Sequence, residues 1–161
     1  MKFGDLKNKP VVGVADAHRL GYVETVLLDL NGLRLLGFRV RSGGLLTHRD
    51  AVLLADVKSV GDDAVTVEDA SRLNAEGKFA ELKNSTDIER LIGARILNET
   101  GHVLGTVADV DIDLEAATVT SYLLEGNLID RVRRQEHVIP TSETKSIGDK
   151  LIVVGNEVTV D

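Results

Sequence analysis

The spacing of apolar residues is the same in two segments of the chain, residues 20–29 (LGYVETVLLD) and residues 104–113 (LGTVADVDID). In each segment the apolar residues first step by three, as from Val23 to Val26, and then by two. Because side chains alternate between the two faces of a β-strand, a step of three shifts the buried face by one residue. A β-bulge has this effect and also bends the strand. The pattern therefore predicts a bent β-strand at the same place in two halves of the chain.

The other segments of the two halves follow the same order. A short strand precedes each bent strand, and there we align Ile92-Gly93 with Val12-Gly13. A returning strand follows each bent strand and places Tyr122 at the position of Phe38. Three later matches are 52–54 with 138–140, 58–62 (KSVGD) with 145–149 (KSIGD), and 64–67 with 151–154. The offset is 80 residues for the first short strand and about 84 to 87 residues for the later segments, and the same order of matches indicates an internal duplication.

Short strands and frequent turn residues predict an all-β, or mainly β, fold class. We expect two small, strongly bent β-barrels, formed by residues 1–69 and residues 92–161 and related by the duplication. Residues 70–91 lie between them and are polar and uneven in pattern. We expect this segment to be a linker with a short helical turn, because residues 86–89 (TDIE) fit a capping box.

The same alternation predicts which side chains fill the two cores. Aromatic residues make up only 3% of the chain and hydrophobic residues 43%, so the cores must consist mostly of Val, Leu and Ile. In the first copy we expect burial of Val23, Val26, Leu28, Phe38, Val40, Val65 and Val67. In the second copy we expect burial of Val107, Val110, Ile112, Tyr122, Leu124, Ile152 and Val154.

Composition then narrows the classes of function. The formal net charge of −7 argues against broad, nonspecific nucleic-acid binding, which needs an excess of Lys and Arg. The absence of cysteine excludes disulfides, zinc-thiolate sites and thiol nucleophiles. The first residues (MKFGDLK) lack the apolar run of a signal peptide, and no stretch approaches the roughly 18 to 20 apolar residues of a membrane span. We therefore expect a soluble, cytoplasmic protein.

Taken in order, these motifs resemble the PRC-barrel domain family. The matching features are an Ile/Val-Gly pair in the first strand, the pattern LGxVxxV followed by an apolar residue and Asp, and a final Ser-Val/Ile-Gly-Asp before the last strand. The resemblance covers residues 10–69 and again residues 92–160. It implies a tandem of two PRC-barrels, each a small and strongly bent β-barrel, which agrees with the bulge pattern.

Members of that family include the cytoplasmic domain of the photosynthetic reaction centre H subunit. Another is the C-terminal domain of a ribosome small-subunit maturation factor, which binds a ribosomal protein. The resemblance implies a non-catalytic interaction or adaptor protein that docks another macromolecule, and it implies no reaction and no cofactor. Neither specific role transfers, since the sequence shows no counterpart of the membrane helix of the first relative or of the additional N-terminal domain of the second.

We therefore expect a protein partner, and the sequence leaves self-association open. One alternative is an RNA-processing or ribosome-associated assembly factor, with RNA or a ribosomal component as the partner. A second alternative is a protein that binds a small molecule or a divalent cation. Salt dependence separates the first two hypotheses, because phosphate contacts make affinity fall steeply as salt rises.

Three carboxylates on the second bent strand are the candidates for a metal site. Asp109, Asp111 and Asp113 are spaced to project from one face of a strand, and Ca²⁺ and Mg²⁺ take carboxylate oxygens. The spacing begins like an EF-hand loop, but Leu114 replaces the glycine at the sixth position and Thr120 replaces the glutamate at the twelfth. We expect a solvated face that binds no metal tightly.

No residue pattern predicts an enzyme. His18, His48, His102 and His137 lack metal-binding spacing such as His-x-x-x-His, and none of the serines has the context of a nucleophile elbow. The glycines at 43–44 are not followed by the Gly-Lys-Thr of a phosphate-binding loop. We expect no catalytic residues.

Two groups of arginines are the candidates for partner binding. They are Arg39, Arg41 and Arg49 in the first copy and Arg131, Arg133 and Arg134 in the second. Because Arg39 and Arg41 alternate with apolar residues, their side chains must leave the barrel on its outer face. Arginine suits bidentate contacts with carboxylates or phosphates, so we expect an acidic partner surface, or an RNA backbone in the alternative, near these residues. The competing interpretation is an ordinary solubilising surface.

Overall fold

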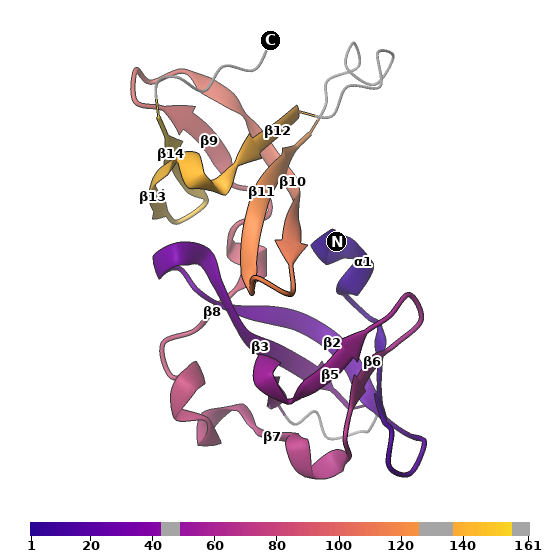
Figure 1. Ribbon diagram of the computed structural model, residues 1–161. Coiled ribbons are helices and arrows are strands. Elements are labelled where there is room, and N and C mark those ends of the chain that lie inside the picture. The colour runs from indigo at the N-terminus through magenta and orange to yellow at the C-terminus, as the bar shows by residue number, and fades with distance from the viewer. Residues whose placement is uncertain (43–48, 126–136, 156–161) are drawn as a thin grey trace. The chain divides into compact units, whose positions relative to one another are not determined.

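The computed structural model describes residues 1–42, 49–125 and 137–155, and the chain divides into two compact units. Residues 4–88 form the N-terminal unit, and residues 1–3 together with 89–161 form the C-terminal unit. Strands dominate the described residues, and each described helix is a short turn of three or four residues (Figure 1). The predicted fold class, mainly β, is confirmed.

The N-terminal unit is a curled sheet with strand order β5-β6-β1-β2-β3-β4-β7. Its strands are β1 (Pro10–Gly13), β2 (His18–Asp29), β3 (Arg34–Arg41), β4 (Arg49–Leu53), β5 (Val57–Val60), β6 (Val65–Val67), β7 (Asn74–Ala75) and β8 (Thr86–Asp87). Its 3-10 turns are η1 (Asn31–Leu33), η2 (Leu54–Asp56), η3 (Ala70–Arg72), η4 (Glu76–Lys78) and η5 (Ala80–Leu82). One edge of β2 pairs with β3, and the other edge pairs with β1 at its start and with β8 at its end.

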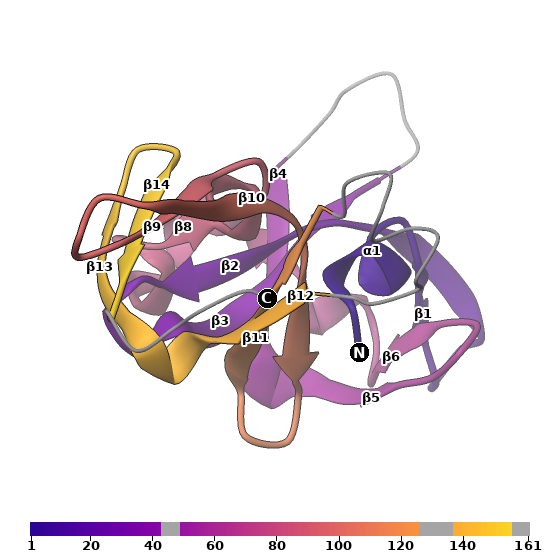
Figure 2. The same cartoon turned by 90° about the horizontal axis from the view of Figure 1, so that it is seen from above.

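The C-terminal unit repeats this order as β13-β14-β9-β10-β11-β12. Its strands are β9 (Arg95–Asn98), β10 (Val103–Asp113), β11 (Thr118–Leu124), β12 (His137–Pro140), β13 (Thr144–Gly148) and β14 (Leu151–Val154), and η7 (Thr141–Glu143) precedes β13. Figure 2 shows β13, β14 and β9 side by side, with β14 parallel to β9. In the N-terminal unit, β6 is parallel to β1 in the same way. Two further turns, α1 (Phe3–Leu6) and η6 (Ile88–Arg90), lie where the chain passes from one unit to the other.

The predicted bulges occur in both long strands. In β2 the pairing with β3 shifts register between Val23 and Thr25, so Glu24 is the extra residue. In β10 the pairing with β11 shifts between Val107 and Asp109, so Ala108 is the extra residue. A second shift, which the sequence pattern did not indicate, follows in each hairpin, between 27 and 28 and between 111 and 112. The first shift bends the long strand, and the second, whose extra residue is Leu36 in β3 and Thr120 in β11, bends the returning strand at the same place in both hairpins.

The predicted cores are also confirmed, and every residue expected to be buried is 7% exposed or less. Phe38 and Tyr122 occupy equivalent positions, since Phe38 pairs with Val26 and Tyr122 pairs with Val110. Phe38 and Tyr122 are the largest fully buried side chains. With few aromatics in the chain, the aliphatic side chains around them supply most of the buried apolar surface.

Two of the sequence alignments need correction. Val11 pairs with Gly21 and Ile96 pairs with Gly105, so Ile96 takes the place of Val11, and aligning Ile92-Gly93 with Val12-Gly13 was wrong. The match of 52–54 with 138–140 is one residue out of register, since Val52 pairs with Phe38 and Ile139 pairs with Tyr122. Both alignments rested on residue identity within short segments. Identity alone does not determine the register of such a segment against the bent strand and its returning strand.

The connecting residues belong to the N-terminal unit as far as Ile88. We call residues 69–88 the cover segment, because they return across the sheet: β7 pairs with β4, and β8 pairs with β2. Leu82 is buried against Leu27 and Ala51, and Phe79 packs against the same cluster. The cover segment is therefore anchored on the sheet face opposite the barrel core.

Candidate interaction site

Arg39 lies at the centre of the sheet face that the cover segment crosses. It pairs with Thr25 on β2 and with Ala51 on β4, and it is flanked along β3 by the buried Phe38 and Val40. Its side chain leaves the barrel on the outer face, as alternation requires. Other residues of the unit nevertheless cover it, because Arg39 is only 8% exposed.

Carboxylates of the same unit hold the buried guanidinium. Arg39 Nε and Nη2 each donate to Glu76 at 3.0 Å, and Nη1 and Nη2 donate to Asp87 at 2.8 and 3.0 Å. Glu24, the extra residue of the β2 bulge, lies 3.8 Å from Nε. Burial by itself lowers the pKa of Arg39, but the hydrogen bonds to Asp87 and Glu76 outweigh it and raise the pKa above its ordinary value. Arg39 is therefore a fixed cation that ties the cover segment to the sheet.

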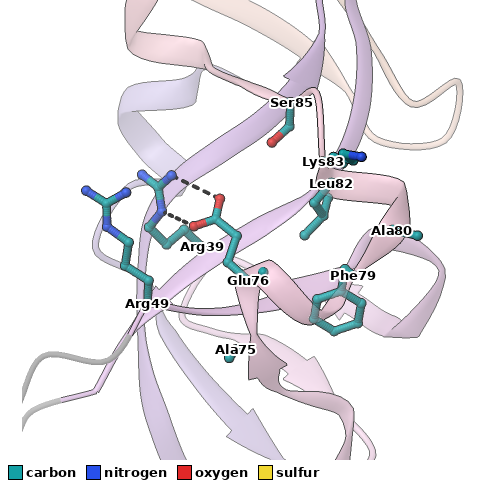
Figure 3. A pocket seen from close by; sticks show the side chains of 10 residues that line it. Arg39, Arg49, Ala75, Glu76, Phe79, Ala80, Leu82, Lys83 and Ser85 are labelled. Carbon is teal, nitrogen blue, oxygen red and sulfur yellow. Dashed lines mark hydrogen bonds and ion pairs between the residues drawn. The ribbon is translucent and has the colours of Figure 1, made fainter.

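A pocket of about 750 Å³ lies between the sheet and the cover segment (Figure 3). Its lining residues are Arg39, Arg49, Ala75, Glu76, Gly77, Phe79, Ala80, Leu82, Lys83 and Ser85. Phe79 and Leu82 give it an apolar side, and Figure 3 shows Glu76 pointing toward Arg39. The pocket lies wholly within the N-terminal unit.

Two cations at this pocket differ from Arg39. Arg49 and Lys83 are exposed, and within residues 1–42, 49–125 and 137–155 neither forms an ion pair. Arg49 comes from the start of β4 and Lys83 follows η5, so the sheet and the cover segment each supply one cation. Free cations beside apolar surface can bind carboxylates of a ligand whose other groups pack on the apolar side.

The remaining predicted arginines are placed differently. Arg41 is exposed, stacks on the Tyr22 ring at 5.8 Å and reaches the Asn8 side chain at 3.5 Å, outside the pocket lining. Arg131, Arg133 and Arg134 lie outside the described residues. Of the predicted set, the pocket brings together Arg39 and Arg49.

The three aspartates of β10 do not gather into a site. Asp113 is exposed, and its Oδ1 accepts the amides of Glu115 and Ala116 at 3.0 Å in the turn after the strand. Asp109 and Asp111 are half-buried, more covered than expected, and Asp109 Oδ1 accepts the amide of Val110 at 2.8 Å. No group of three His, Cys, Asp or Glu side chains that could hold a metal is found among the described residues.

Sequence reasoning missed the carboxylates that hold Arg39 and the cover-segment residues that line the pocket. One signal was present: the position of Arg39 in β3 is taken by Leu123 in β11, where Leu123 pairs with Asp109 and Val138. A charged residue at a position where its repeat carries a buried leucine indicates a local change of environment. The partners Glu76 and Asp87 lie 37 and 48 residues away in sequence, so no local pattern connects them.

No helix among the described residues is long and apolar enough to cross a membrane. Comparison with curated proteins gives no significant match. The family model of the PRC-barrel domain matches the chain twice, over residues 1–73 and residues 84–159. Together these matches span most of the chain and agree with the repeated strand order and register. The chain therefore belongs to the PRC-barrel domain family and carries two copies of the domain in tandem.

Proposed function

We propose that this protein is a non-catalytic interaction module whose pocket docks an extended acidic segment of a partner protein. The PRC-barrel domain is a general protein-interaction fold, which supports a binding role.

The observation that carries the proposal is the pair of exposed cations, Arg49 and Lys83, on the lining of a pocket that also presents Phe79. Arg39 is already held by two carboxylates and serves to fix the cover segment. A peptide that alternates acidic and apolar side chains matches this surface, since its carboxylates meet the cations and an apolar side chain packs on Phe79. Arginine and aromatic residues are also enriched at protein interfaces.

The charge around the pocket favours a protein segment over RNA. Glu76 lines the pocket and Asp87 and Glu24 surround Arg39, so a chain of phosphates would meet carboxylates as well as cations. The formal net charge of −7 repels a backbone with one charge per nucleotide more strongly than a segment with one or two carboxylates. Arg49 and Lys83 suit one or two carboxylates better than an extended nucleic-acid backbone, which needs many phosphate contacts.

The test is affinity purification from the native cell with three tagged proteins. These are the unaltered chain, the double variant Arg49→Ala/Lys83→Ala, and the control Arg95→Ala/Lys145→Ala, which removes the same charge from exposed positions of the C-terminal unit. We expect the unaltered chain and the control to retain the same partner. The partner's affinity for the pocket variant should be at least about fivefold weaker than for the unaltered chain, equivalent to roughly 1 kcal/mol. Equal retention by both double variants would rule out this pocket as the docking site.

Salt and nuclease treatment of the same samples separate the alternative. Retention that is lost after ribonuclease treatment, and that falls steeply between low and physiological salt, would identify the RNA-associated hypothesis instead. Retention that survives both treatments supports the acidic protein segment.

A further inference from the structure

The two repeats begin earlier than their first strands. Residues 1–9 and 86–94, which we call the leading segments, match in detail at an offset of 85 residues. Asn8 and Gly93 both have positive φ, 69° and 82°, and their amides donate to the equivalent carbonyls of Val23 and Val107 at 2.8 and 2.7 Å. The apolar pattern agrees as well, with Phe3 and Leu6 matching Ile88 and Leu91, and all four are buried.

The first residues of each leading segment pair with the long strand of the other repeat. Thr86 and Asp87, which lead into the second repeat, pair with Leu28 and Leu27 on β2 of the first. Residues 1–2, which lead into the first repeat, pair with Ile112 and Asp111 on β10 of the second. The residues that receive them are equivalent, since Leu27 and Leu28 on β2 correspond to Asp111 and Ile112 on β10 at an offset of 84 residues.

The boundaries of the compact units show the same reciprocity. The chain leaves the C-terminal unit between Phe3 and Gly4, and it leaves the N-terminal unit between Ile88 and Glu89. Phe3 and Ile88 are equivalent residues, so each repeat passes from the other unit into its own at the same point. Each sheet is completed by residues that belong, by sequence, to the other repeat.

We propose that this chain is the single-chain form of a segment-exchanged dimer, in which each repeat donates the first three residues of its leading segment, 1–3 or 86–88, to the other. The exchange makes each unit incomplete by itself, because removing the donor would expose a strand edge and take away a buried Phe3 or Ile88. A repeat standing alone would need a second copy to supply its missing segment. This inference is independent of the proposed pocket.

The absence of native cysteine allows a direct test with two matched cysteine pairs. The first variant, Lys2→Cys/Asp111→Cys, joins a leading segment to the strand that it pairs with in the exchanged form. The second, Asp87→Cys/Asp111→Cys, joins the residues that would pair if each repeat kept its own leading segment. Met1 and Ile112 exchange both backbone hydrogen bonds, at 2.7 and 3.2 Å, so Lys2 and Asp111 form a non-hydrogen-bonded pair. Such pairs hold their Cα atoms within disulfide range.

After mild oxidation we expect most of the Lys2→Cys/Asp111→Cys protein to run as a cross-linked monomer on a non-reducing gel, while the Asp87→Cys/Asp111→Cys protein stays reduced. Circular dichroism of both variants checks that they fold. Efficient oxidation of the second pair, or covalent dimers from the first, would overturn the proposal.

A further measurement needs no substitution in the pairing residues. A specific protease site is inserted after Gly77, which is exposed and faces open space, and the folded full chain is then cut. Because residues 1–3 belong to one unit and 78–88 to the other, we expect the two fragments to elute together in gel filtration at micromolar concentration. Separation of the fragments under native conditions would contradict the exchange.

Discussion

Arg39 and Glu76 meet through two parallel hydrogen bonds, from Nε and Nη2 to the two carboxylate oxygens, each 3.0 Å long. Removing the guanidinium leaves Glu76 and Asp87 facing one another without a cation. We therefore expect Arg39→Ala to lower the free energy of unfolding by about 3 kcal/mol, measured by urea denaturation.

The control for this prediction is the exposed ion pair Lys58–Glu68, whose Nζ and Oε2 atoms lie 2.6 Å apart. Its side chains are about half exposed, so Lys58→Ala should cost less than about 1 kcal/mol. Equal losses in the two variants would mean that burial does not strengthen the Arg39 network.

Tyr122 and Thr144 form a polar pair in the C-terminal unit that has no equivalent in the N-terminal unit. Their hydroxyl oxygens are 2.7 Å apart, whereas the equivalent residues in the N-terminal unit are Phe38 and Val57. Tyr122→Phe should cost about 1 kcal/mol, because the half-buried Thr144 hydroxyl loses its partner. Adding Thr144→Val reproduces the apolar pair and should recover most of that loss in thermal melts. No recovery in the double variant would contradict the equivalence.

Gly21 and Gly105 occupy equivalent positions but have different neighbours. A methyl group at Gly21 would lie 2.5 Å from the Arg41 carbonyl oxygen, whereas at Gly105 its nearest atom is the movable Leu124 Cδ1 at 3.0 Å. We expect Gly21→Ala to destabilise by about 3 kcal/mol and Gly105→Ala by about 1 kcal/mol. Urea midpoints of the two variants give the comparison, and the opposite order would contradict the steric argument.

Asp29 supplies a prediction for pH. The Asn31 amide, and then the Arg34 side chain, donate to its carboxylate at 2.9 and 3.0 Å and lower its pKa from the ordinary value. Because the folded pKa lies below the unfolded one, the stabilising contribution is present above the unfolded pKa and is lost as pH falls through the folded pKa.

In Arg34→Gln the pKa of Asp29 should rise but stay below the ordinary value, since the Asn31 amide remains. Carboxyl chemical shifts followed through a pH titration measure both proteins. A return to the ordinary pKa would show that the arginine, and not the amide, was the main cause.

Calcium provides the last prediction. The Asp109 and Asp113 oxygens already accept backbone amides, so binding a cation would require breaking local hydrogen bonds. Calorimetric titration should show no binding at micromolar strength. Micromolar binding that Asp111→Asn abolishes would restore the β10 carboxylates as a metal site.

The bent strands and the cores could be predicted from the sequence because both depend on local spacing. The step from Val23 to Val26 and its repeat in 107–110 mark the bulge directly. The burial of Arg39 could not be predicted, because it depends on a cover segment that returns across the sheet from more than thirty residues away.

The leading segments show a second limit. The pattern Phe3-x-x-Leu6 and its match Ile88-x-x-Leu91 is visible in the sequence. Which sheet receives the first residues of each segment is not visible, because an exchanged and an unexchanged pairing bury the same side chains at equivalent edges. Pairing partners such as Lys2 and Asp111 are set by the path of the chain and not by the residues themselves.

The bulge in the long strand is kept in both repeats, although the residue at its extra position differs between them. Glu24 and Ala108 are the extra residues of the same register shift, yet one faces a guanidinium and the other is exposed. Substitution at such a position leaves the curvature of the barrel intact, because the extra residue does not set the pairing on either side of it. After duplication, one copy can therefore be preserved as a scaffold while the other accumulates changes on its surface and acquires a new specificity.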